Sequence, residues 1–261
     1  MDNELVLMDR LGVIKSANEK WGLENNAYLS FSGGKDSRFV IIKPTKPIKA
    51  VLEKHGYPFK SKEFSHIYQV FQHSGKQGKS VQKYLREYSG ANYGTIVCPA
   101  CLKPLFDAET IPFKVSDECC LRLKKQPIKK YEKENDRHIA ITGMRKAEGG
   151  QRMALKGCIL TDKDGQLKKF HPLAVVDDEW EDWFVESEGI VLCKLYYPPF
   201  NFKRTGCKGC PFSLDLQEQL SIMEIYLPNE RKQCEIVWEK VYSLYRKLGY
   251  RLSKSEQGKL F

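Results

Sequence analysis

Residues 27–37 read Ala-Tyr-Leu-Ser-Phe-Ser-Gly-Gly-Lys-Asp-Ser, and this stretch decides the predicted fold. Its first six residues are apolar or β-favouring, which predicts a short buried strand. The two adjacent glycines that follow let the backbone approach a ligand closely. Successive N–H groups in such a turn form a concave anion site, to which Ser32 and Ser37 add hydroxyls and Lys35 adds a positive charge. A strand followed by this ordered string predicts a phosphate-binding loop.

The string at residues 30–37 resembles the Ser-Gly-Gly-x-Asp-Ser signature of the PP-loop ATP pyrophosphatases. Within that group it is most similar to the phosphoadenylyl-sulfate (PAPS) reductase family. The resemblance implies an α/β fold of the adenine nucleotide α-hydrolase-like (HUP or Rossmann-like) type, with a mostly parallel sheet and helices on both faces. It also implies an adenine nucleotide, either ATP with Mg²⁺ or a sulfonucleotide. The loop residues assigned to this nucleotide are Ser30, Ser32, Gly33, Gly34, Lys35, Asp36 and Ser37.

The segment after Ser37 departs from the family pattern. Residues 38–43 read Arg-Phe-Val-Ile-Ile-Lys, which predicts a second strand directly behind the loop. A parallel crossover needs about a dozen residues, usually a helix, and no such segment fits between the two strands. We therefore expect that a segment after Ser37 is deleted or omitted from the sequence.

Composition indicates a globular protein with anionic partners. The chain has 261 residues, of which 41% are hydrophobic and 29% charged, and a formal net charge of +10. This charge favours nucleotides, sulfated compounds or nucleic acid as partners. The sequence contains no apolar run of about 18 residues and no basic-then-apolar start, so we expect a cytoplasmic protein without a membrane span.

Strand and helix patterns alternate along the chain, which also predicts an α/β sheet with helices on both faces. We expect a PP-loop nucleotide-binding domain at residues 1–175 and a C-terminal region at 176–261. Within the second region, residues 214–261 form a helical appendage. Helices are predicted at residues 4–25, 46–56, 62–74, 79–89, 118–133, 177–188, 214–227 and 230–248, and further strands at 138–142, 157–160 and 167–170. The last two strands are predicted to form a hairpin, because Asp164-Gly165 lies in the turn between them.

The nine cysteines indicate metal or redox chemistry rather than a disulfide framework, because their number is odd. Cys119-Cys120 and the Cys-x-x-Cys of Cys207 and Cys210 together supply four thiolates. Four thiolates are what a [4Fe–4S] cluster requires, although zinc also accepts them, and a buried apolar role for the adjacent pair stays open. The separate Cys-x-x-Cys at residues 98–101 is a redox pair, half of a zinc site or incidental.

The order of these motifs extends the resemblance. Cys-Cys followed by a distant Cys-x-x-Cys is similar to the cluster-binding arrangement of iron–sulfur sulfonucleotide reductases and of DNA phosphorothioation PP-loop proteins. The resemblance thus implies a [4Fe–4S] cluster on Cys119, Cys120, Cys207 and Cys210. Between the two motifs lies a Gly-x-Arg-x-x-Glu-x-x-x-Arg element with Gly143, Arg145, Glu148 and Arg152. Its arginines suit sulfate or phosphate oxygens, and the alternative is a salt-bridged loop with Glu148.

The tail at residues 253–261 contains no cysteine, whereas the assimilatory reductases that the core resembles carry a nucleophilic cysteine there. Cys234 lies within a predicted helix, where we expect packing rather than reactivity. Sulfur would then be handled at the cluster or by Cys98 and Cys101.

We expect a PAPS reductase-family enzyme with Lys35, Asp36, Arg145 and Arg152 as catalytic residues and Gly143 near the nucleotide. Its reaction is either sulfonucleotide reduction or adenylation followed by sulfur transfer to nucleic acid. The implied partners are DNA or tRNA as the acceptor and a sulfur or electron donor protein. The alternative is a non-enzymatic iron–sulfur or zinc module that binds nucleic acid on a degenerate PP-loop scaffold.

Overall fold

The computed structural model describes residues 2–30, 42–87, 97–107, 111–202 and 206–253. Contacts divide the chain into two units. Unit 1 contains Met1–Ile42 and Ile128–Lys194, and unit 2 contains Lys43–Pro127 and Leu195–Phe261. This division differs from the single boundary near residue 175 expected from the sequence. Each unit combines segments far apart along the chain, because strand pairing and helix packing join them.

Unit 1 is built on a four-stranded sheet in the order β1-β2-β4-β3. β1 and β2 are parallel, β2 and β4 are parallel, and β3 pairs with β4 in the antiparallel direction. The predicted mostly parallel sheet and the predicted hairpin are both confirmed. The strands are β1 (Ala27–Ser30), β2 (Ile139–Thr142), β3 (Ile159–Thr161) and β4 (Leu167–Phe170).

The turn between β3 and β4 is organised by two residues. The Asp162 carboxylate accepts hydrogen bonds from the backbone N–H groups of Asp164 and Gln166, at 3.0 and 2.9 Å. Gly165 adopts φ +76°, a left-handed conformation that favours glycine. The Asp-Gly signal in the sequence therefore acts as a hairpin turn.

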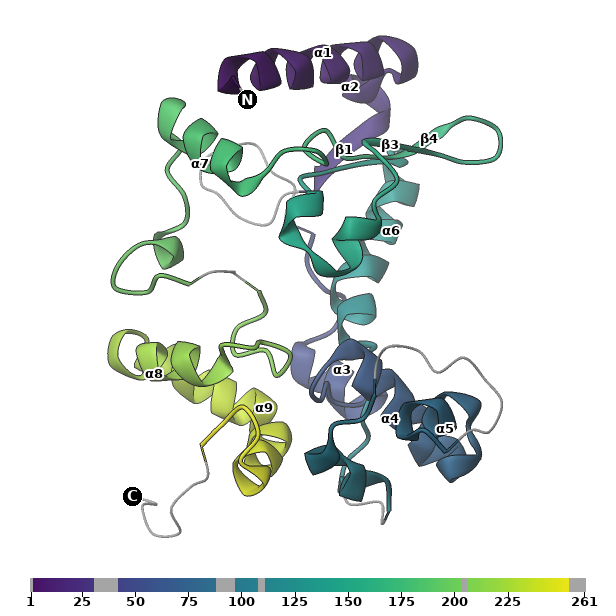
Figure 1. The fold of residues 1–261 in the computed structure, drawn as a ribbon, viewed down its shortest axis with the longest axis vertical. Coiled ribbons are helices and arrows are strands. Elements are labelled where there is room, and N and C mark those ends of the chain that lie inside the picture. Colours follow the sequence, from purple (N-terminus) through teal and green to yellow (C-terminus); the bar gives the residue numbers. More distant parts are fainter. Residues whose placement is uncertain (1, 31–41, 88–96, 108–110, 203–205, 254–261) are drawn as a thin grey trace. The chain divides into compact units, whose positions relative to one another are not determined.

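Helices cover both faces of this sheet, with α1 and α6 on opposite sides (Figure 1). Ala17 from α1 and Leu23 from α2 pack with Ala27, Ile139 and Phe170 of the strands. No helix in the described ranges is long and apolar enough to cross a membrane. The helices are α1 (Asn3–Trp21), α2 (Leu23–Asn26), α6 (Gln126–Glu134), which starts at the unit boundary, and α7 (Asp178–Ser187).

Unit 2 is helical and has an aromatic core. Phe64 stacks on Tyr68 with ring centroids 5.6 Å apart, and Phe59 lies 4.9 Å from Tyr245. The second contact joins the 43–127 segment to the C-terminal helices. The helices are α3 (Ile48–His55), α4 (Lys62–Ser74), α5 (Lys79–Leu85), α8 (Leu216–Tyr226) and α9 (Pro228–Leu248), together with a 3₁₀ segment at Ala100–Phe106.

Two prolines explain where the helices differ from expectation. The predicted helix at 118–133 is a π-helical turn at Leu121–Lys125 followed by α6, because Pro127 cannot donate the hydrogen bond that a continuous α-helix needs. Pro228 is the first residue of α9 rather than a break, since proline fits the first helical position. The strand predicted at 38–43 and the loop before it fall largely on residues outside the described ranges.

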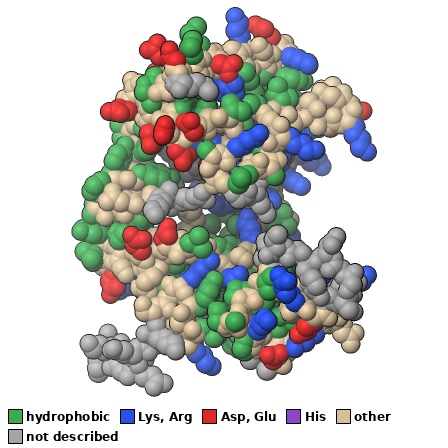
Figure 2. Space-filling view, viewed as in Figure 1, with side chains coloured by type: hydrophobic (Ala, Val, Ile, Leu, Met, Phe, Trp, Pro, Cys, Tyr) green, Lys and Arg blue, Asp and Glu red, His purple; other side chains and the backbone are tan. Residues whose placement is uncertain are grey.

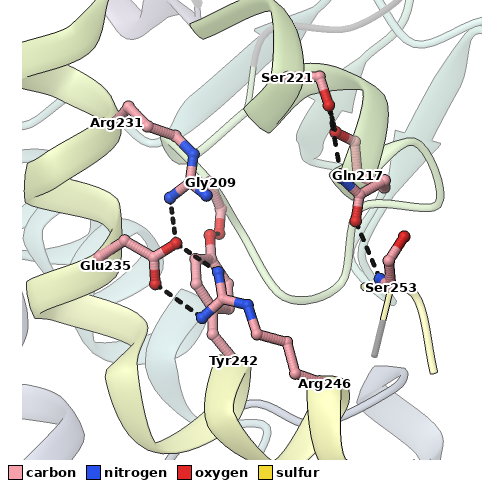
Figure 3. Close-up of polar contacts among 8 residues, drawn as sticks. All are labelled: Gly209, Gln217, Ser221, Arg231, Glu235, Tyr242, Arg246 and Ser253. Atoms are coloured by element: carbon pink, nitrogen blue, oxygen red, sulfur yellow. Dashed lines mark hydrogen bonds and ion pairs between the residues drawn. The ribbon is translucent and has the colours of Figure 1, made fainter. Parts of the chain in front are cut away.

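A pH-dependent contribution to stability comes from Glu235 on α9, whose carboxylate is shared by Arg231 and Arg246 (Figure 3). Burial opposes ionisation, but hydrogen bonds from the two arginines hold the pKa of Glu235 below its ordinary value of 4.5. The carboxylate therefore stabilises the fold above pH 4.5, and this contribution is lost as the pH falls through the lowered pKa.

We expect Glu235→Gln to lower the free energy of unfolding at pH 7 by about 1 kcal/mol, because the group is partly exposed. The difference from the wild type should shrink below about pH 4. Denaturant unfolding at several pH values measures both effects. Glu239→Gln on the exposed face of α9 is the matched control, and equal losses in the two variants at pH 7 would contradict the assignment.

Candidate functional site

Four cysteines from two distant segments converge within unit 2. Cys119 and Cys120 directly precede the π-helical turn, and Cys207 and Cys210 lie in a tight loop closed by a 3.0 Å bond from Cys210 N to the Cys207 carbonyl. Cys119 lies within electrostatic reach of both Cys120 and Cys210, and Cys210 within reach of both Cys207 and Cys120. The structure thus brings together the four residues predicted as metal ligands.

The thiols of this group differ in pKa, because their surroundings differ. The hydrogen bond between the adjacent thiols raises the pKa of Cys119 and lowers the pKa of Cys120 to about 6, with help from nearby lysines. Burial raises the pKa of Cys210 to about 11. Because thiolates are the metal ligands, metal binding here would release protons.

A single ion and a polynuclear centre place different demands on these four thiols. Within the described ranges, no three His, Cys, Asp or Glu side chains are arranged so that they could hold one metal ion. One tetrahedral zinc ion holds its sulfur ligands at about 2.3 Å, so four thiolates around it must lie close together. A [4Fe–4S] cluster takes the same four thiolates over a larger volume.

An open pocket of about 540 Å³ adjoins the cysteine group. Cys207 lines it together with Leu123, and the segment from Lys43 to Ile48 forms one side. Three lysines, at positions 43, 46 and 124, contribute ammonium groups. The pocket therefore offers positive charge beside a thiol, which suits an anionic ligand.

Helix α9 holds the Cys207–Cys210 loop in place. The Trp238 indole donates to the carbonyl of Lys208 at 3.0 Å, and the Tyr242 hydroxyl donates to the carbonyl of Gly209 (Figure 3). Tyr245 donates to the carbonyl of Pro211 at 3.0 Å. These three side chains recur at helical spacing, so one face of α9 satisfies three carbonyl groups between positions 208 and 211.

The sequence analysis missed this role of the C-terminal helices. It treated residues 214–261 as an appendage, although the aromatic positions 238, 242 and 245 share one helical face. This aromatic spacing predicts that one face of the helix is buried, but it does not predict which segment packs against that face. Arg251 adds a further 2.6 Å bond to the Pro211 carbonyl, which closes the loop from the far end of α9.

The predicted arginines lie in unit 1, after β2. Arg145 is buried, at 6% exposure, and forms ion pairs with Asp178 and Glu181 of α7. Arg152 pairs with Glu148, whose carboxylate also accepts the backbone N–H of Arg145 at 3.3 Å. The salt-bridged loop considered as an alternative is therefore present in this structure.

The remaining predicted nucleotide residues are less completely described. Ser30 ends β1 beside Thr142, and Gly143 follows β2 at the same edge of the sheet. Ser32, Gly33, Gly34, Lys35, Asp36 and Ser37 lie outside the described residues. Their predicted role as the nucleotide loop stays a prediction.

The sequence analysis also missed a polar pair at the carboxyl edge of the sheet. Thr142 ends β2 and His171 directly follows β4, with 2.6 Å between the Thr142 hydroxyl and His171 Nδ1. Burial, with a smaller effect of Lys169, lowers the pKa of His171 and favours its neutral form. Ligands of parallel α/β sheets bind at this edge. No local motif marks either residue.

The two cysteines of the second Cys-x-x-Cys, at positions 98 and 101, differ in exposure. Cys98 is buried and hydrogen-bonded to Tyr84, and burial raises its pKa to about 11. Cys101 is exposed. In the part of the chain that the structure describes, the two have no third ligand for a metal ion.

The close packing around Gly209 can be tested by substitution. Its φ is +60°, and an added Cβ would lie 2.7 Å from Cys234 Sγ and 2.5 Å from the Tyr242 hydroxyl. We expect Gly209→Ala to lower the free energy of unfolding by about 2–4 kcal/mol, because left-handed backbone strain and overlap add. Gly206→Ala is the matched control, since nothing lies within 4 Å of its Cβ position. Equal unfolding midpoints for the two variants would refute the loop geometry.

Comparison with known proteins agrees with the fold. The profile of the phosphoadenosine phosphosulfate reductase domain matches residues 26–213, more than two thirds of the chain. Among curated proteins none matches this chain. The matched range includes β1, the predicted loop, the four cysteines and the sheet, and it ends before α8. The chain therefore belongs to the phosphoadenosine phosphosulfate reductase domain family.

Proposed function

We propose that the protein is an adenine-nucleotide-binding enzyme of sulfur metabolism that carries a [4Fe–4S] cluster on Cys119, Cys120, Cys207 and Cys210. Members of its family are generally enzymes, and the family implies nucleotide and sulfur chemistry. The observation that carries the proposal is the convergence of these four thiols within one unit of the matched domain.

In this proposal the nucleotide occupies the carboxyl edge of the sheet. Ser30, Ser32, Gly33, Gly34 and Ser37 line the phosphates, Lys35 neutralises their charge, and Asp36 is the acidic partner for Mg²⁺ when ATP is bound. Gly143 leaves room for the nucleotide after β2. Parallel strands end at this edge, where backbone N–H groups are free to meet a ligand.

The arginines would stabilise charge at the reacting end of the nucleotide. Arg145 is already buried between carboxylates of α7, so an anionic substrate has to compete with Asp178 and Glu181 for its guanidinium. Arg152 is partly exposed, which makes it the easier of the two for a ligand to reach. Their catalytic role therefore requires that these ion pairs exchange when substrate binds.

The cysteines and their surroundings would define the sulfur site. When bound, an iron–sulfur cluster supplies redox and electrostatic chemistry tuned by hydrogen bonding and burial. Cys119 is buried in the core, Cys210 is half-buried, and Cys207 lines the lysine-lined pocket. An oxidised or activated sulfur group with negative charge would be held by those lysines next to the cluster.

Two reactions suit this site. One is reductive cleavage of a sulfonucleotide, and the other is adenylation of an acceptor followed by sulfur transfer to nucleic acid. Both need the nucleotide loop and the four thiolates. A nucleic-acid-binding module without turnover is the competing function, favoured by the net charge of +10.

The cluster is tested by the iron and acid-labile sulfide content of anaerobically purified protein. We expect about four of each per chain, with most of both lost in Cys207→Ser. Cys193→Ser is the matched control, because Cys193 is exposed and lies in the other unit. Zinc in place of iron, or no metal in the wild type, would contradict the proposed cluster.

Enzymatic turnover is tested with Lys35→Ala. We expect release of AMP and pyrophosphate from ATP, or cleavage of a sulfonucleotide, to fall by about 100-fold, since a positioned charge is removed. Lys15→Ala on the exposed side of α1 should leave the rate unchanged. No turnover in the wild type, with nucleic-acid binding retained in Lys35→Ala, would favour the non-enzymatic module instead.

A further inference from the structure

Five lysines of unit 2 carry charge that no neighbouring carboxylate balances. They are exposed, and none of them forms an ion pair with a carboxylate among the residues that the structure describes. Some other basic groups of the unit are paired, such as Lys76 with Asp107 and Arg122 with Glu118. Further exposed lysines, such as Lys49 and Lys232, also lack an ion pair among the described residues, but they lie neither in the pocket nor within electrostatic reach of Cys120. The five, which we call the lysine surface, are Lys43, Lys46, Lys62, Lys124 and Lys125.

The lysine surface lies beside the cysteine group. Three of its members line the pocket that contains Cys207. Lys62, Lys124 and Lys125 each lie within electrostatic reach of the Cys120 sulfur. Lys124 belongs to both sets and so connects the pocket with the adjacent cysteines. Charges from three separate segments of the chain therefore gather at one place.

The whole net charge of the protein resides in the same unit. Unit 2 contains 26 basic and 14 acidic residues, whereas unit 1 contains 17 and 19, which together account for the 43 and 33 of the chain. In unit 1, acidic side chains gather over α7 (Figure 2). Such segregation of charge indicates a polyanionic partner for unit 2 rather than a general effect on solubility.

We propose that the lysine surface binds the phosphodiester backbone of a nucleic acid and places it beside the cysteine group. The inference deepens the proposed function, because it names nucleic acid as the sulfur acceptor. An extended set of exposed ammonium groups suits a run of phosphates, whereas one nucleotide needs an enclosed site. Between the lysines, Pro44, Pro47 and Leu123 offer apolar contact for a sugar or base.

Salt dependence is the signature of such a surface. Each phosphate neutralised by a lysine contributes about −0.9 to the slope of log affinity against log salt on duplex DNA. Five lysines in contact therefore predict a slope of about −4 to −5. A single bound nucleotide contacts fewer phosphates and gives a much weaker dependence.

The experiment measures fluorescence anisotropy of a labelled DNA duplex and of labelled tRNA with the full-length protein, between about 50 and 200 mM salt. The test variant combines Lys43→Gln, Lys46→Gln and Lys124→Gln. We expect it to bind at least about 10-fold more weakly and to reduce the slope by about 3. Whichever of the two nucleic acids binds more tightly identifies the source of the phosphodiester.

The matched control combines Lys15→Gln, Lys20→Gln and Lys163→Gln, which removes the same charge from exposed positions of unit 1. We expect less than about a twofold effect on affinity, because none of these lysines lines the pocket or lies within electrostatic reach of Cys120. Circular dichroism checks the fold of both variants. If the triple variant of unit 2 unfolds, the pair Lys62→Gln and Lys125→Gln takes its place, with a slope reduced by about 2.

Several outcomes overturn the inference. These are no binding by the wild type, equal losses in the two triple variants, or binding only to vesicles of anionic phospholipid. The proposed function fails separately, through absence of iron or of nucleotide turnover. Iron-free Cys207→Ser that still binds nucleic acid with the full salt slope supports the lysine surface on its own.

Discussion

Buried carbonyl groups of the Cys207–Cys210 loop need hydrogen-bond donors, and the arrangement of unit 2 depends on how this need is met. One face of α9 supplies an indole and a tyrosine hydroxyl to two carbonyls of the loop, and a second tyrosine hydroxyl to the carbonyl of Pro211 that follows it. The loop must approach the helix closely, so Gly209 has no room for a side chain. A helix outside the matched family domain is therefore part of the support of the cysteine group.

The same donors connect the cysteine group to the rest of the unit. The Tyr245 hydroxyl also accepts the backbone N–H of Lys60 at 2.7 Å, and its ring packs on Phe59. The ammonium group of Lys60 in turn lies within electrostatic reach of the Cys98 and Cys101 thiols. Tyr245 thus bonds both to Pro211, beside one Cys-x-x-Cys, and to Lys60, near the other. The helices of both parts of unit 2 share one core.

Buried and exposed cations have different roles in the two units. Arg145 is buried, and a buried charge is tolerated only with partners, which α7 provides. Exposed lysines keep their hydration and need no partner, so their charge stays available to a ligand. The ion pairs of the arginines therefore stabilise unit 1 in this structure. The ammonium groups of the lysine surface remain available to an anionic ligand.

The sequence by itself determined the local elements and the family. α4 runs from Lys62 to Ser74 as predicted, the hairpin turn was encoded by Asp-Gly, and the mostly parallel sheet is confirmed. These features depend on short-range backbone preferences and on side-chain periodicity. Tertiary structure alone decided that the chain interleaves two units, that α9 supports the cysteine loop and that Thr142 meets His171. Such contacts join residues far apart along the chain, and they depend on which faces pack together rather than on any local pattern.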